Sequence, residues 1–152
     1  MLIPAGRVLR FSGSGEYLAS FGGRSGPGGG GTIHIWMAES LDPVTSIQGE
    51  SPFMDVAFDP AGDRIAACDG GHEVDLFDVH DAERLGRLVN VMRHTGLRWS
   101  QDGVWLAALS RSNIAPVWFT GQRESIPSVR SRLGTPSELL SSGGSTLVLH
   151  EE

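Results

Sequence analysis

The sequence predicts an all-β protein, a β-propeller built from four-stranded antiparallel blades. Three aromatic residues, Trp36, Phe77 and Trp118, recur every 41 residues, and each closes a short apolar strand. Around each of them the same order returns: an apolar strand, a turn of Ser, Asp, Pro and Gly, and a second strand rich in Ala and Leu. A fixed period of about 40 to 45 residues with several strands in each unit is the signature of a propeller.

Four units can be aligned strand by strand. The first strands are expected at 8–11, 55–58, 96–99 and 129–133, each followed by a turn at 12–15, 59–62, 100–103 and 134–137. The second strands are expected at 17–21, 64–68, 105–109 and 138–142, and the third at 33–36, 74–78, 115–118 and 146–150. Turn-forming residues occupy the breaks, and aromatic or β-branched residues fill many of the strands, as hairpins require.

The whole chain, 1–152, is interpreted as one propeller module. With outer strands at 44–48, 85–91 and 122–126, its blades cover about 7–48, 53–91, 94–126 and 128–152. The fourth blade has no outer strand of its own, and the apolar start of segment 1–4 is expected to supply one. Three arrangements remain open: a compact single-chain ring, a homodimer that completes an eight-bladed ring, and a part of a longer propeller.

The pattern resembles the WD-repeat family of β-propellers. The resemblance is carried by 58–63 (FDPAGD), 99–103 (WSQDG), 18–20 (LAS) and the strand ends at Trp36 and Phe77. It covers nearly the whole chain, and it implies repeat anchors at Phe11, Trp36, Phe58, Phe77, Trp99 and Trp118.

The copies depart from the family in two places. Gly49-Glu50 is the nearest stand-in for the family's Gly-His pair, and Gly71 and Ser112 replace an aspartate of the second turn. The buried hydrogen-bond network of the family is therefore expected to be absent or altered. Other propellers with units of about forty residues share the Asp-Pro-x-Gly turn and remain fold-level alternatives.

Composition narrows the class of protein. The net charge is −6, and all 12 basic residues are arginines that form no concentrated basic segment, so a nucleic-acid partner is not expected. No apolar run approaches membrane-spanning length, and the first residues do not have the character of a signal peptide, so no membrane partner is expected. With a single cysteine, Cys68, the sequence indicates a cytoplasmic protein.

The sequence predicts neither catalysis nor a bound metal or other cofactor. Cys68, His72 and His80 do not have the spacing of a zinc site. No nucleophile elbow is present. The remaining histidines lie on or beside strands and are interpreted as packed or surface residues: His34, His94 and His150.

The leading hypothesis is therefore a non-enzymatic scaffold that mediates protein–protein interaction or assembly, with a protein or peptide partner whose identity the sequence does not give. Loops on one propeller face commonly bind partners, and the candidate residues there are Arg24, Asp69, His72, Arg93, Arg111 and Asn113. The alternative is a small-molecule or glycan-binding propeller, even a hydrolytic one, with its site at the central channel. The first strands would line that channel with a mixed set of charges: Arg10, Asp55, Arg98, Arg130 and Arg132.

Overall fold

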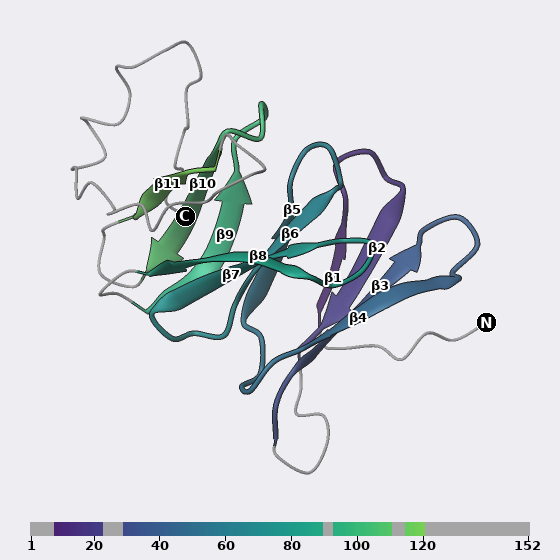
Figure 1. The fold of residues 1–152 in the computed structure, drawn as a ribbon, viewed down its shortest axis with the longest axis horizontal. Coiled ribbons are helices and arrows are strands. Elements are labelled where there is room, and N and C mark those ends of the chain that lie inside the picture. The colour runs from purple at the N-terminus through teal and green to yellow at the C-terminus, as the bar shows by residue number, and fades with distance from the viewer. Residues whose placement is uncertain (1–7, 23–28, 90–92, 111–114, 121–152) are drawn as a thin grey trace.

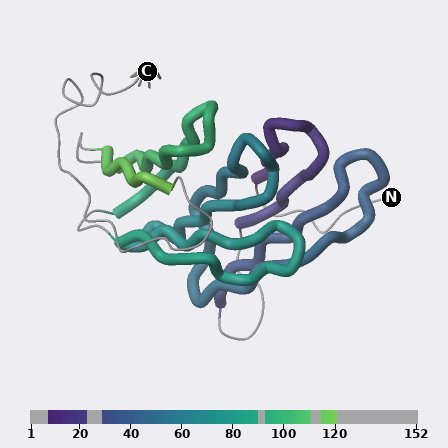
Figure 2. Tube along the Cα trace, turned by 45° about the horizontal axis from the view of Figure 1, so that its top comes forward, coloured from purple at the N-terminus to yellow at the C-terminus, as the bar shows by residue number. Residues whose placement is uncertain are grey.

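The protein forms propeller blades, in which antiparallel sheets lie side by side in chain order (Figures 1 and 2). The computed structural model describes residues 8–22, 29–89, 93–110 and 115–120. Within these residues it contains strands and no helix, and thus no helix that could cross a membrane. The all-β fold class and the partial propeller are confirmed.

Each sheet is a meander of consecutive strands. Blade 1 consists of β1 (Val8–Phe11), β2 (Tyr17–Phe21), β3 (Thr32–Met37) and β4 (Pro43–Gln48). Blade 2 consists of β5 (Asp55–Phe58), β6 (Arg64–Cys68), β7 (Glu73–Asp78) and β8 (Arg84–Val89). Blade 3 consists of β9 (His94–Trp99), β10 (Trp105–Ser110) and β11 (Val117–Phe119). The outer strand expected at 122–126, the fourth blade and the closing segment 1–4 lie outside the described residues.

The turn between the first two strands is the same in all three blades. Its first residue is Ser12, Asp59 or Ser100, and a side-chain oxygen of each accepts the N–H five positions on, at 3.0, 3.1 and 2.9 Å. The fourth residue is a glycine with φ between +71° and +82° in every blade. Because other residues adopt this conformation only at a steric cost, the repeated Ser/Asp and Gly positions reflect one turn geometry.

The hydrophobic core lies between the blades. One apolar cluster joins blades 1 and 2, and a second joins blades 2 and 3, so blade 2 is buried on both faces. Ala66, Leu76 and Leu88 of blade 2 face Leu97 and the other apolar residues of blade 3. Four of the aromatic repeat positions are at most 9% exposed: Trp36, Phe58, Phe77 and Trp118.

The last residue of a first strand packs against the blade before it. Phe58 stacks on Tyr17 of blade 1 with ring centroids 6.4 Å apart, and the Arg64 guanidinium of blade 2 lies 4.7 Å from the ring centre of Trp99. Phe11 occupies the same position in blade 1 but is 64% exposed, because no described blade precedes blade 1. The assignment of Phe11 as a repeat anchor therefore stays a prediction, and Trp99, which we expected to be largely buried, is only partly buried.

A buried side-chain hydrogen bond is present in blade 1 and missing in blade 3. The Trp36 indole Nε1 donates to Ser20 Oγ at 3.3 Å. Trp118 occupies the corresponding place in blade 3, and its buried Nε1 has no hydrogen-bond partner among the described residues. Ala108 stands where blade 1 has Ser20, so the side chain that would accept this N–H is absent.

We predict that Ala108→Ser stabilises the protein by about 1 kcal/mol, because it supplies the missing acceptor for the Trp118 indole. The matched control is Ala67→Ser at the same position of blade 2, where the third strand carries Phe77 and offers no indole N–H. Burying an unpaired hydroxyl there should cost about 1 kcal/mol or more. Urea unfolding compares the two variants, and a loss of stability in both would contradict the expected bond.

Candidate binding site

A buried carboxylate connects the first strands of all three blades. Asp55 begins β5, and its side chain is 5% exposed. Arg10 Nη2 from β1 donates to Asp55 Oδ1 at 3.0 Å, and the Leu97 N–H from β9 donates to Oδ2 at 3.0 Å. Arg98 Nη1 lies 3.5 Å from the same Oδ2. A buried carboxylate is tolerated only with such partners, so Asp55 fixes the relative position of three inner strands.

The two arginines that flank Asp55 remain open to solvent. The side chains of Arg10 and Arg98 are 40% and 60% exposed. Each also donates from Nη1 to the carbonyl of the preceding residue, at 3.2 Å to Leu9 and 2.7 Å to Leu97. Two guanidinium groups and one carboxylate leave an excess of positive charge at this point.

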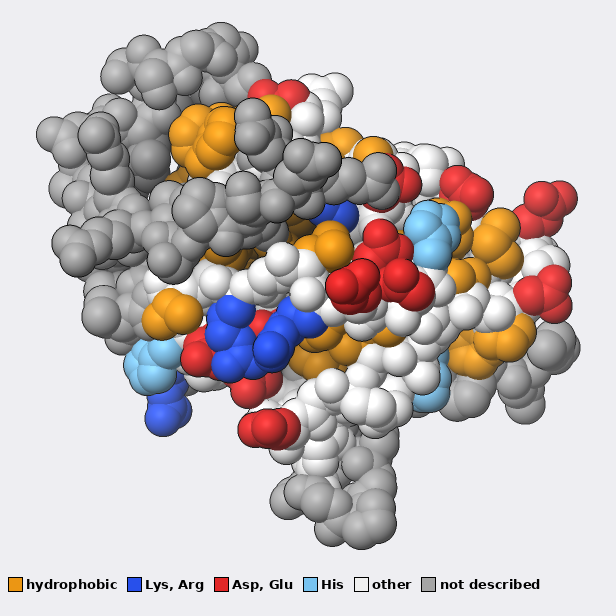
Figure 3. Space-filling view, viewed as in Figure 1, with side chains coloured by type: hydrophobic (Ala, Val, Ile, Leu, Met, Phe, Trp, Pro, Cys, Tyr) orange, Lys and Arg blue, Asp and Glu red, His pale blue; other side chains and the backbone are white. Residues whose placement is uncertain are grey.

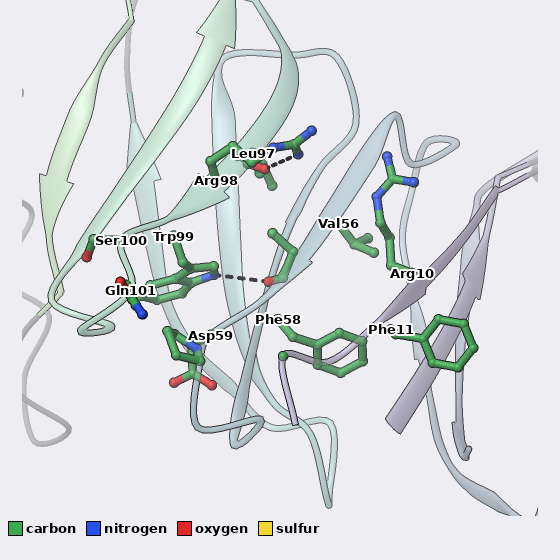
Figure 4. Close-up of a pocket in the computed structure, with 13 residues that line it drawn as sticks. Arg10, Phe11, Val56, Phe58, Asp59, Leu97, Arg98, Trp99, Ser100 and Gln101 are labelled. Atoms are coloured by element: carbon green, nitrogen blue, oxygen red, sulfur yellow. Dashed lines mark hydrogen bonds between the residues drawn. The ribbon is translucent and has the colours of Figure 1, made fainter. Parts of the chain in front are cut away.

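An open groove of about 340 Å³ runs beside this cluster along β1, β5 and β9. Its apolar lining includes Phe11, Phe58 and Trp99, and its edges are formed by the turns that follow the first strands. Figure 4 shows both guanidinium groups at one end of the groove and the aromatic rings farther along the strands. The Trp99 indole Nε1 donates to the Ala57 carbonyl at 3.0 Å, which fixes this ring in the groove.

Three of the residues predicted for a binding face lie in or beside the turn that connects β6 and β7. Asp69 and His72 are exposed in the β6–β7 turn, and Arg93 is exposed immediately before β9. The His94 N–H donates to the Gly71 carbonyl at 3.2 Å, which ties this turn to the start of β9. The remaining candidates lie outside the described residues: Arg24, Arg111 and Asn113.

Two side chains of types that can act in catalysis or metal binding, Cys68 and His94, are buried in the core. Burial raises the pKa of Cys68 to about 12, so its thiol is protonated at neutral pH. Burial also lowers the pKa of His94, against an opposing effect from the His72 backbone. The neutral ring lies edge-on to Trp118 with centroids 5.6 Å apart. Within the described ranges, no group of three or more His, Cys, Asp or Glu residues could hold a metal ion.

A second group of charged side chains lies over β7 and β8. Figure 3 shows basic side chains gathered over β7 and β8 with acidic ones beside them. Arg87 contacts Glu73 at 2.6 Å and Asp75 at 2.7 Å there. There one guanidinium group is paired with two carboxylates, whereas in the Arg10–Asp55–Arg98 cluster two guanidinium groups share a single carboxylate.

The loop face that the sequence predicts does not include the Arg10–Asp55–Arg98 cluster, whose residues the sequence places in the lining of the central channel. The alignment of the repeats nevertheless contains a pattern that indicates this cluster. Arg10 and Arg98 share the penultimate position of their strands, and Asp55 is an acidic residue in an otherwise apolar strand. In the fourth unit Arg132 has that penultimate position, outside the described residues.

Comparison with solved structures identifies the fold. The β-propeller domain of Cps50 (Swd1) from Myceliophteria thermophila superposes with a TM-score of 0.64 and 20% identity, over 79% of this chain and 36% of that one. The chain has the fold of WD-repeat propeller blades. Hsv2 from Kluyvelomyces marxianus superposes with a TM-score of 0.61 and 21% identity, over 77% of this chain and 38% of that one.

The similarity covers only part of each matched protein. The chain matches less than two fifths of the length of either propeller protein. No protein-family model matches the sequence, and no curated protein matches it.

Proposed function

We propose that this chain is a non-catalytic propeller module that binds a protein or peptide partner along the inner strands of its blades. The observation that carries the proposal is the groove of about 340 Å³ shared by three blades. Its lining combines aromatic side chains with Arg10 and Arg98, and these residue types are enriched in protein interfaces and in their energetic hot spots. WD-repeat propeller folds among the solved structures support this general class of function.

The residues that line the groove favour binding over catalysis. Among the residues that the structure describes, the lining contains neither histidine nor cysteine. The carboxylate of Asp59 lines it as well, but its oxygens accept from Arg64 Nε at 2.7 Å and from the Arg64 N–H at 3.1 Å. A general base must reach a substrate proton, and the Asp59 side chain is only 3% exposed.

Site-specific photo-crosslinking tests the proposal. Benzoylphenylalanine is placed at Gln101, an exposed residue on the edge of the groove, or at Glu39, an exposed residue of the β3–β4 turn. We expect the Gln101 variant to form a discrete protein adduct in cell extract and the Glu39 variant to form none. Adducts of equal yield from both positions, or from neither, would contradict a partner in the groove.

We also propose that a further blade covers the outward face of blade 1. Leu9 and Phe11 are 48% and 64% exposed on this face, whereas their counterparts Val56 and Phe58 in blade 2 are buried. Exposed apolar side chains gathered on one face are typical of an interface. The covering blade comes from the chain itself in a compact ring, from a second copy in an eight-bladed homodimer, or from a longer propeller. Only the contact with a second copy depends on protein concentration.

A further inference from the structure

We propose that the groove receives an acidic segment of the partner, with a carboxylate side chain held between Arg10 and Arg98 and an apolar side chain on the aromatic floor. This inference rests on the proposed function and specifies the chemistry of the partner.

The first argument is the local balance of charge. The Asp55 carboxylate already has the Leu97 N–H and the Arg10 guanidinium as hydrogen-bond partners, and Arg98 lies beside it. One carboxylate neutralises only one of the two guanidinium groups, so a carboxylate from the partner would neutralise the other. The net charge of −6 does not oppose this, because charges more than about 8 Å apart are largely screened at physiological ionic strength.

The second argument is that the arginines are held in position before a ligand arrives. Arg10 is fixed by Asp55 and by the Leu9 carbonyl, and Arg98 by the Leu97 carbonyl. Their exposed N–H groups form planar forks that match the geometry of a carboxylate. Because these side chains are already ordered, binding costs less conformational entropy than at free surface arginines.

The third argument distinguishes a peptide from a small anion. A free carboxylate or phosphate would contact the arginines and leave the rest of the groove uncovered. The aromatic rings of Phe58 and Trp99 lie farther along the same groove, as Figure 4 shows. A segment in which an apolar residue stands near an acidic one would cover both parts.

Fluorescence anisotropy with two labelled peptides tests the inference. One peptide alternates glutamate and leucine, and the other has glutamine in place of glutamate. We expect the glutamate peptide to bind at least about tenfold more tightly, which corresponds to one charge-assisted contact. Arg98→Gln should remove about the same factor, while Arg84→Gln, at an exposed arginine of β8 outside the groove, should change the affinity less than twofold.

The Arg98 substitution is suited to this test because the fold does not depend on it. Asp55 keeps its bonds to Arg10 and to the Leu97 N–H when Arg98 is replaced. Thermal unfolding of the variant, expected to match the parent, checks this directly.

Three results would overturn the inference. Equal affinity for the two peptides removes the acidic requirement. Displacement by inorganic phosphate or free glutamate at concentrations similar to those of the peptide indicates a small-anion site. Adduct formation at Gln101 without binding of the acidic peptide leaves the proposed function standing and rejects only this chemistry of the partner.

Discussion

Replacing Arg64 by methionine is expected to lower the free energy of unfolding by about 3–5 kcal/mol, the cost of breaking a buried ion pair. Its guanidinium donates to Asp59 at 2.7 Å and to the carbonyls of Thr120 and Gly103 at 3.0 Å each, while it lies over the Trp99 ring. The Asp59 side chain is only 3% exposed, so losing Arg64 leaves a buried carboxylate without its cation. Blades 2 and 3 lose a bridge at the same time.

Arg87 is the matched control for this prediction. It pairs with Glu73 and Asp75 at similar distances, but its side chain is 41% exposed. Because exposed ion pairs are worth about 0–1 kcal/mol, Arg87→Met should cost no more than that. The double variant Asp59→Asn with Arg64→Met should recover part of the loss, since no unpaired charge remains. Urea unfolding of all three variants measures these differences, and equal costs for Arg64 and Arg87 would show that burial does not matter here.

The strands and turns of blades 1 and 2 could be predicted from the sequence because their determinants are local. Four predicted strands, 8–11, 17–21, 55–58 and 64–68, have the bounds that the structure gives. The turns between them require a Ser or Asp at the first place and a Gly with positive φ at the fourth, and both are readable in one chain. Figure 1 shows the resulting blades in order.

The contacts between blades could not be predicted in the same way, because they depend on which strand lies opposite. Arg64 begins a second strand, as Tyr17 does, and nothing in its own unit indicates that it reaches Trp99 of the next blade. In the sequence, Asp55 is a single acidic residue in an apolar strand. Only the structure shows that Arg10 and Arg98, each more than forty residues away, contact its carboxylate. The same dependence explains why Phe11, which has no preceding blade among the described residues, is exposed.

Phe58→Ala is expected to lower the free energy of unfolding by about 3–5 kcal/mol, as truncation of a core aromatic does. Phe58 is 9% exposed, belongs to the cluster between blades 1 and 2, and stacks on Tyr17. Phe11→Ala is the matched control, because the same residue stands at the same position of blade 1 and is 64% exposed. Its cost should stay below about 1 kcal/mol at low protein concentration, where surface substitutions have small effects.

Repeating the Phe11→Ala measurement at increasing protein concentration separates the proposed sources of the covering blade, because a compact single-chain ring would give a large cost at every concentration. If a second copy packs on the outward face of blade 1, the truncated ring is in the dimer interface, and the cost of Phe11→Ala grows with concentration toward that of Phe58→Ala. Sedimentation of the parent protein should then show a dimer that the variant weakens. A cost that stays small at every concentration, with a monomer throughout, would reject the homodimer and leave blades of a longer propeller as the covering surface.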